Sequence, residues 1–163
     1  MERILTDIIS LLETNRSAIG LSYIDEDYGQ MESGTDTYPV TYPAVLIELQ
    51  NIDWEGTGGR EQRGEATIVV RTYIDCYDDT HALSTTIDKV KERTKIASDV
   101  TSLLHECRLS GGATLTRTAS AFATIGNGIK QYETTYRSIV WQRFRREEER
   151  QKINAYKIEM NRE

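Results

Sequence analysis

The chain has 163 residues, 38% of them hydrophobic and 28% charged, and its formal net charge is −6. This length is enough for one domain with a sizeable core, and the composition excludes a disordered protein. The negative charge disfavours a general nucleic-acid binder, which carries a basic face, although acidic walls suit a path along which DNA slides without sticking.

The two cysteines and the N-terminus indicate where the protein is made. Cys76 and Cys107 lie far apart without a CxxC partner, so we expect reduced, buried thiols in a protein made in the cytoplasm. The first residues contain acids and no continuous apolar run, and no later run approaches the length of a membrane span. The sequence therefore predicts no signal peptide and no contact with a membrane.

The first predicted elements are a helix over residues 1–14 and a short strand over residues 21–24. The helix is indicated by apolar residues at steps of three and four, namely Ile4, Leu5, Ile8, Leu11 and Leu12. An acidic loop over residues 25–41 follows, unusually long for a compact domain. This loop resembles a calcium loop only in part, since its glycine stands one place early, and a solvated acidic loop is the favoured interpretation.

A hairpin forms the centre of the predicted fold. Residues 43–49 are almost wholly apolar, which predicts a strand covered on both faces, and residues 51–63 are predicted to form a wide, Gly-rich turn. The returning strand, residues 64–75, places Ala66, Ile68, Val70, Thr72 and Ile74 on the face expected to meet a helix. The glycines of the turn join two antiparallel strands, so the pattern is not that of a phosphate-binding loop.

A helix of nearly thirty residues is predicted next, capped at Asp78 and Asp79 and ended by Gly111 and Gly112. Its apolar stripe consists of Leu83, Ile87, Val90, Ala97, Val100, Leu104 and Cys107. Such a helix is longer than a small sheet needs, so we expect one of its ends to overhang the sheet.

A second hairpin is predicted from residues 114–124 and 132–144, because Gly126-Asn127-Gly128 is a strong turn signal between them. Residues 145–163 are highly charged and contain few apolar side chains. We therefore predict a domain over residues 1–144 and a charged extension over residues 145–163. A chain ending before Arg145 should still fold, while its assembly weakens.

The sequence contains no catalytic signature, and we predict no enzyme, no cofactor and no bound metal. His81 and His105 are both expected in the long helix, too far apart to act together and without Cys or carboxylate at ligand spacing. Cys76 has no His nearby in the sequence. Asp75, Asp78 and Asp79 could form a carboxylate cluster, but their expected positions at the end of a strand and at the start of a helix account for them without any chemistry.

Aromatic residues and arginines are the side chains that protein interfaces use as anchors. They gather in the Gly-rich turn and at the end of the last strand, and the predicted interface between copies consists of Trp54, Arg60, Arg63, Tyr136, Trp141, Arg143, Phe144 and Arg145. The alternative interpretation, ordinary core aromatics beside a solvated basic end, stays open.

The order of the elements, with Pro-Ala-Val-Leu-Ile-Glu-Leu at residues 43–49 and Gly-Glu-Ala-Thr-Ile-Val-Val-Arg-Thr-Tyr from residue 64, resembles the phage tail-terminator and tail-completion (head-tail joining) proteins. The resemblance covers residues 1–144; the loop at 25–41 and the extension from Arg145 depart from the compact family pattern. It implies an α+β fold: a mixed, mostly antiparallel sheet of four to five strands with an N-terminal helix and one long helix packed on one face.

The resemblance also implies a function. Such proteins are non-enzymatic virion components that form a ring, commonly a hexamer and otherwise a dodecamer, at the head-proximal end of the tail. The implied partners are copies of the same chain, the neighbouring tail-tube and neck or connector proteins, and DNA that passes through the lumen without specific binding. The implied location is the tail or neck of a virion assembled in the host cytoplasm. Another ring of the head-tail connector, and a small α+β enzyme or binding module, remain the alternatives.

Overall fold

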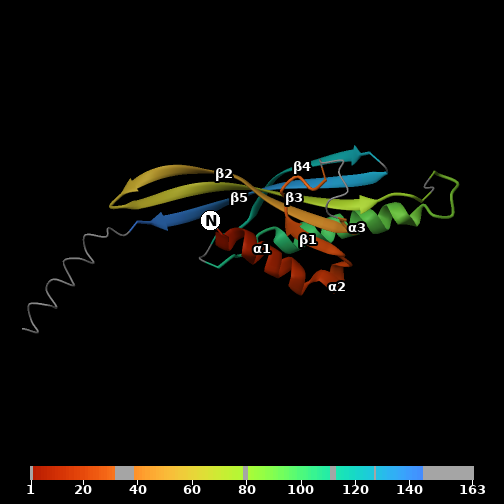
Figure 1. The fold of residues 1–163 in the computed structure, drawn as a ribbon, viewed down its shortest axis with the longest axis horizontal. Coiled ribbons are helices and arrows are strands. Elements are labelled where there is room, and N and C mark those ends of the chain that lie inside the picture. Colours follow the sequence, from red (N-terminus) through yellow and green to blue (C-terminus); the bar gives the residue numbers. More distant parts are fainter. Residues whose placement is uncertain (1, 32–38, 79–80, 111–112, 127, 145–163) are drawn as a thin grey trace, which may run out of the picture.

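The computed structural model describes residues 2–31, 39–78, 81–110, 113–126 and 128–144 (Figure 1). The predicted extension over residues 145–163, Arg145 included, lies outside these residues. The elements are α1 (Glu2–Thr14), α2 (Arg16–Ile19), β1 (Tyr23–Glu26), β2 (Ala44–Gly58), β3 (Glu61–Asp75), α3 (Asp88–Leu104), β4 (Thr116–Ile125) and β5 (Ile129–Arg143).

The strands form one five-stranded mixed sheet in the order β1-β2-β3-β5-β4. β1 runs parallel to β2, and all other neighbouring pairs are antiparallel. The α+β fold class predicted from the sequence is confirmed, including the number of strands and the mixed pairing. β1 begins at Tyr23, two residues later than the predicted strand.

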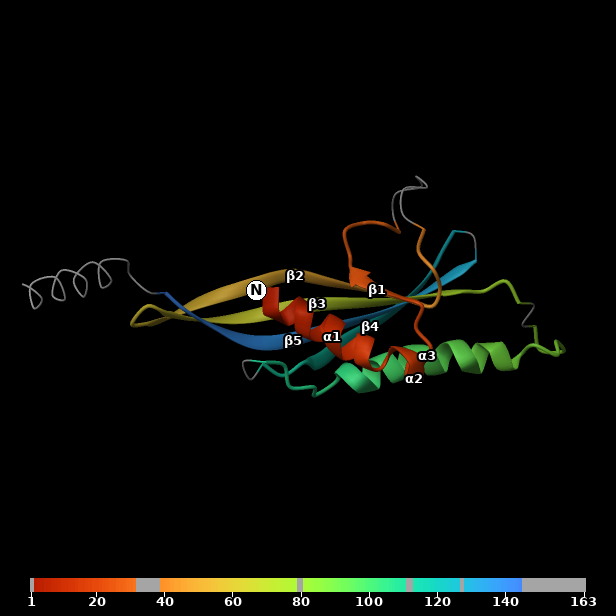
Figure 2. The same ribbon diagram turned by 60° about the horizontal axis from the view of Figure 1, so that its bottom comes forward.

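Helices α1 and α3 cover one face of the sheet, called here the helix face (Figures 1 and 2). The core lies between these layers. In α1, Ile4, Ile8 and Leu12 recur every four residues and are all buried, as the sequence pattern predicted. They meet a row of β3 side chains that alternate along the strand, with Ala66, Ile68 and Val70 fully or almost fully buried.

The opposite face of the sheet carries a second, smaller cluster. Ala44, Leu46 and Tyr73 are buried there against side chains of the acidic loop, among them Met31 and Tyr42. Because α1 and the loop cover both sides of this part of β2, the residues from Ala44 to Ile47 have no exposed surface. The predicted strand covered on both faces is confirmed for this stretch.

The wide turn predicted over residues 51–63 is wrong. β2 continues to Gly58 and β3 starts at Glu61, so the chain reverses in only two residues, Gly59 and Arg60. Both have positive φ, +61° and 70°, which is the backbone of a tight type I′ hairpin turn. Gly56 and Gly58, which the sequence pattern placed in the turn, belong to strand β2.

The long helix is also shorter than predicted, because it begins at Asp88 rather than near Asp79. Polar side chains hold the preceding residues in turns: the Nδ1 of His81 accepts a hydrogen bond from the N–H of Leu83, and the Oγ of Ser84 accepts one from the N–H of Thr86, both at 3.1 Å. Such local bonds compete with helical hydrogen bonds. His81 therefore lies outside the helix, and His105 follows its last residue.

No helix within the described residues is both long enough and apolar enough to span a membrane.

A pair of leucine substitutions tests the corrected helix boundary. Leu104 is fully buried in the core, whereas Leu83 is 91% exposed in the turn before the helix. We expect Leu104→Ala to lower the free energy of unfolding by about 2–5 kcal/mol, the usual cost of removing a buried leucine side chain. Leu83→Ala should change it by less than about 0.5 kcal/mol. Urea unfolding followed by circular dichroism measures both, and equal losses would contradict the boundary at Asp88.

Candidate functional site

Three strands of the sheet extend beyond the helices that cover its other half (Figures 1 and 2). We call this extension the distal arm; it consists of residues 51–63 of the β2–β3 hairpin and residues 138–144 at the end of β5. The arm starts at a β-bulge between Leu49 and Asn51, an irregularity that bends and twists a strand. From Asp53 to Arg60 every residue of the arm is exposed.

On the helix face of the arm, the indole of Trp54 packs against a glycine. Trp54 pairs with Gly64 across the β2–β3 ladder. A Cβ atom at Gly64 would lie 2.8 Å from two ring carbons of Trp54 and 2.7 Å from the Cγ2 of Ile52. The absence of a side chain at Gly64 therefore leaves room for the indole against β3, although 37% of Trp54 remains exposed.

The opposite face of the arm carries ion pairs between neighbouring strands. Arg143 contacts Glu61 at 3.1 Å, and Arg63 contacts Glu55 at 3.9 Å. All four side chains are substantially exposed, so each pair contributes little to stability. Trp141 lies between these pairs, opposite Arg63 in the ladder, and is 63% exposed.

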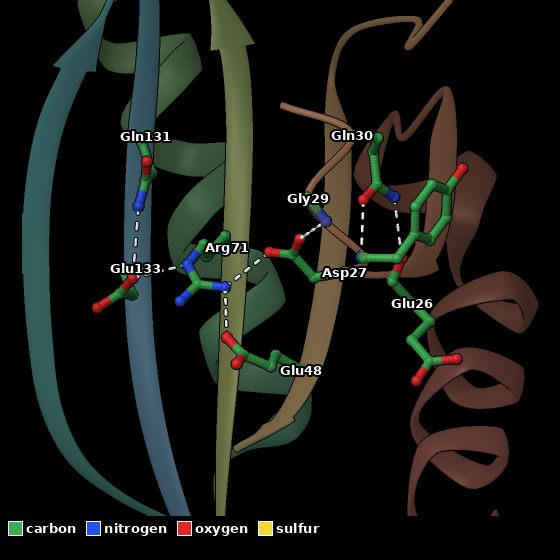
Figure 3. Close-up of polar contacts among 9 residues, drawn as sticks. Glu26, Asp27, Gly29, Gln30, Glu48, Arg71, Gln131 and Glu133 are labelled. Carbon is green, nitrogen blue, oxygen red and sulfur yellow. Dashed lines mark hydrogen bonds and ion pairs between the residues drawn. The ribbon is translucent and has the colours of Figure 1, made fainter. Parts of the chain in front are cut away.

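A single arginine joins four segments in the covered half of the sheet, where it lies opposite Leu46 of β2 (Figure 3). Arg71 of β3 contacts Asp27 after β1 at 2.6 Å, and Glu48 of β2 and Glu133 of β5 at 2.8 Å each. Burial lowers the pKa of Arg71, but its hydrogen bonds to the three carboxylates, led by Glu48, outweigh burial and raise it above its usual value. The cluster fixes the start of the acidic loop on the sheet.

Both borders of the sheet expose unpaired strand edges. No described strand pairs with β4 on the side away from β5, and every β4 residue from Thr116 to Thr124 is exposed. At the other border, β1 pairs with β2 only from Ala44 to Ile47, so the rest of the β2 edge is open among the described residues. Long exposed edges are templates for pairing with another chain.

The structure gathers six of the eight predicted interface residues on the distal arm. Trp54, Arg60, Arg63, Trp141, Arg143 and Phe144 all lie there, and Arg145 falls outside the described residues. Tyr136 was predicted wrongly: it is fully buried opposite Ile68 in the core, where burial raises the pKa of its phenol to about 12. It is not available as a surface anchor.

Two features of this surface were not predicted. The exposed β4 edge was missed as a site because its sequence, rich in Thr and Ala, identifies a strand but not its position in the sheet. The Arg71 cluster was missed because its carboxylates come from distant segments. A lone arginine in an otherwise uncharged stretch of β3, from Ala66 to Ile74, was the one signal available.

The described residues form no metal site of the kind that the acidic loop or the histidines could suggest. Three or more His, Cys, Asp or Glu side chains suited to a metal do not converge anywhere in that part of the chain. Of the carboxylates predicted in the acidic loop, Asp27 binds Arg71, and Asp25, which lies in β1, accepts a hydrogen bond from the hydroxyl of Tyr23 at 2.6 Å. Cys76 and Cys107 are free thiols.

A glycine pair tests the packing of Trp54. We expect Gly64→Ala to destabilise the fold by about 1–3 kcal/mol, because the added methyl group displaces the indole and Ile52. Gly56→Ala is the matched control in the same arm, since its Cβ would meet nothing within 4 Å. In a Trp141→Phe background, the fluorescence of Trp54 should shift with the first substitution alone. An unchanged spectrum in both variants would contradict the close packing.

An arginine pair tests the cluster in Figure 3. Arg71→Met leaves three carboxylates facing one another and should cost about 3 kcal/mol of stability, as for other partly buried networks that lose one partner. Arg143→Met removes an arginine whose side chain is 76% exposed and should cost less than about 1 kcal/mol. Thermal unfolding at neutral pH distinguishes the two, and similar losses would show that Arg71 has no special structural role.

Comparison with known proteins gives a likeness of fold. No family model matches the sequence, and the search of curated proteins found no match. The fold is similar to a chain in a solved structure titled "Virion of native gene transfer agent (GTA) particle", with a TM-score of 0.57 and 11% sequence identity. The match covers 86% of this chain and 96% of that chain. The chain thus has the fold of a protein found in a virion particle.

Proposed function

We propose that this chain is a non-enzymatic structural protein of a phage-like virion, and that copies of it associate into a closed ring. The observation that carries the proposal is the pair of open sheet borders, β4 on one side and the far part of β2 on the other. The fold similarity to a chain of a virion particle supports the same conclusion.

The directions of the border strands allow copies to join in a ring. β2, β3, β5 and β4 are successively antiparallel, so β4 runs opposite to β2. A neighbour placed with its β2 against β4 therefore adds an antiparallel strand and keeps its helix face on the same side. Such a contact uses two different surfaces, and it closes into a ring when the rotation divides a full turn.

The charges of the two borders are complementary. The open part of β2 carries Asp53 and Glu55 and no basic residue, whereas β4 carries Arg117 and no acid. Opposite charges on two surfaces favour the heterologous pairing over contacts between identical edges. β4 also contains no lysine and no proline, the residues that protect many edge strands from pairing with another chain.

The role that we propose for the ring is that of a tail terminator. A ring at the head-proximal end of a tail ends tube growth and joins the tail to the neck, and it binds tail-tube and connector proteins on its two sides. We propose a hexamer or a dodecamer in the tail or neck of the virion, assembled in the host cytoplasm. The net charge of −6 suits a lumen through which DNA passes without being bound.

The β4 edge provides the test. The unchanged chain should form rings visible by negative staining, with a mass by light scattering that is a multiple of the 18.6 kDa chain. Ala121→Lys with Ala123→Lys places two lysines on the exposed edge and should weaken assembly by about tenfold or more, while the fold is retained. Thr6→Lys with Ser10→Lys adds the same charge to the exposed side of α1 and should leave assembly unchanged.

Two results would contradict the proposal. An unchanged chain that stays monomeric at high concentration excludes self-assembly, and a β4 double variant that still assembles normally excludes pairing through this edge. Antibody labelling of purified particles separates the tail-terminator role from that of another connector ring, because it shows whether the protein lies at the head-proximal end of the tail.

A further inference from the structure

A pocket of about 260 Å³ lies where the distal arm meets α1. Its lining is mixed: Ile52 and Trp54 of β2, Val140 of β5, Ile4 of α1 and Ala113 contribute apolar groups, and Arg3, Ser110 and Gln142 contribute polar ones. The pocket is on the helix face, because Trp54 and Val140 flank Gly64 in the ladder and share the side of the neighbouring core residue Ala66. Side chains from two strands and one helix therefore border a space in the described structure.

One wall of this pocket is an open strand edge. β5 pairs with β3 as far as Arg143, but β4 pairs with β5 only up to Arg137. Among the described residues, nothing pairs with the other side of β5 from residue 138 to residue 143. The backbone groups on that side are available to an added strand, the arrangement by which many proteins bind an extended peptide.

The chain itself contains a segment with the matching pattern. In Tyr156-Lys157-Ile158-Glu159-Met160, apolar and charged residues alternate. Alternation with period two is typical of a strand with one apolar and one polar face. Added to the open edge of β5, such a strand turns three apolar side chains toward the pocket. It also turns Lys157 and Glu159 toward the face with the ion pairs of Arg63 and Arg143.

The direction of β5 decides which copy supplies this segment. β5 leads away from the pocket and ends at the tip of the arm, where the N–H of Phe144 donates to the carbonyl of Arg60 at 3.0 Å. A return to the same pocket requires a reversal of the chain. Among residues 145–155, which connect β5 to the segment, only Asn154 is of a type that forms turns, and a reversal there comes too late in the chain to bring residues 156–160 back to β5.

We propose that residues 156–160 of a neighbouring copy add to residues 138–143 of β5 as an extra strand and fill the pocket beneath Trp54. This inference rests on the self-assembly proposed above, because the segment comes from a second chain. It adds a second contact to the pairing of β4 with β2. The charged extension then joins each copy to the next.

Substitutions in the segment test the proposal in the full-length chain. Ile158→Asp replaces an apolar side chain by a carboxylate among the apolar groups of the pocket, so the concentration at which half of the protein assembles should rise by about tenfold or more. Lys157→Asp is the matched control: it changes the charge more, but it lies on the opposite side of the alternating segment and should shift this concentration much less. Light scattering over a dilution series measures both.

Cross-linking identifies the chain that supplies the segment. Gln142, exposed beside the pocket, is changed to Cys in one chain and Ile158 to Cys in another, with Cys76 and Cys107 replaced by Ala in both. A flexible bismaleimide should join the two kinds of chain when they are mixed. Linkage only within a chain that carries both substitutions would overturn the assignment to a neighbour.

The possible failures are distinguishable. Normal assembly of Ile158→Asp overturns this inference and leaves the proposed ring intact, since β4 and β2 still pair. Failure of the unchanged chain to assemble removes the proposed function itself, and this inference with it.

Discussion

The structure depends on a mismatch between the length of its sheet and the length of the layer that covers it. β2, β3 and β5 each contain 15 residues, which corresponds to about 50 Å of extended chain. α1 has 13 residues and α3 has 17, or about 20 and 26 Å of helix. The two helices lie over the middle of the sheet and over its end away from the β2–β3 turn, so the distal arm extends without a helical layer (Figures 1 and 2).

This constraint explains the two different surfaces of the arm. Without a helix above them, the side chains of the arm are stabilised by their neighbours within the sheet. On the helix face, Trp54 lies across Gly64, and on the opposite face arginines and glutamates pair between strands. In the covered half of the sheet, the three carboxylate partners of Arg71 tie the strands to the start of the acidic loop. The arm, in contrast, keeps aromatic side chains and strand edges exposed.

Exposed edges of this length are hazardous for a monomer and useful for an assembling protein. β4 combines an edge position with side chains that are mostly small and, apart from Arg117, uncharged, so it offers its backbone to another chain with little protection. The β2 border has the opposite direction and the opposite charge. A protein that must join identical copies in a ring needs two such unlike borders, and the proposed contact through residues 156–160 adds a connection at the far end of the same sheet.

The sequence alone determined the elements whose pattern reflects burial. The α1 stripe, the doubly covered start of β2 and the alternating faces of β3 were predicted correctly, because apolar periodicity records directly which side of an element meets the core. Prediction from local sequence failed where the same residue types occur in two kinds of structure. Gly56 and Gly58 indicated a turn but lie in strand β2. The Oγ of Ser84 accepts a hydrogen bond from the N–H of Thr86, and this local bond interrupts the predicted helix.

Tertiary structure decided the order of the strands, and with it the candidate site. Which strand lies at a border depends on pairing between distant segments, so the exposure of β4 is not visible in its own sequence. The position of Tyr136 was also decided by tertiary structure. The residues of β5 alternate between two faces that both carry bulky groups, so the sequence does not show which face meets the core. Arg71 likewise acquires its partners only when four segments converge, since a charge carries no record in the sequence of the groups that will neutralise it.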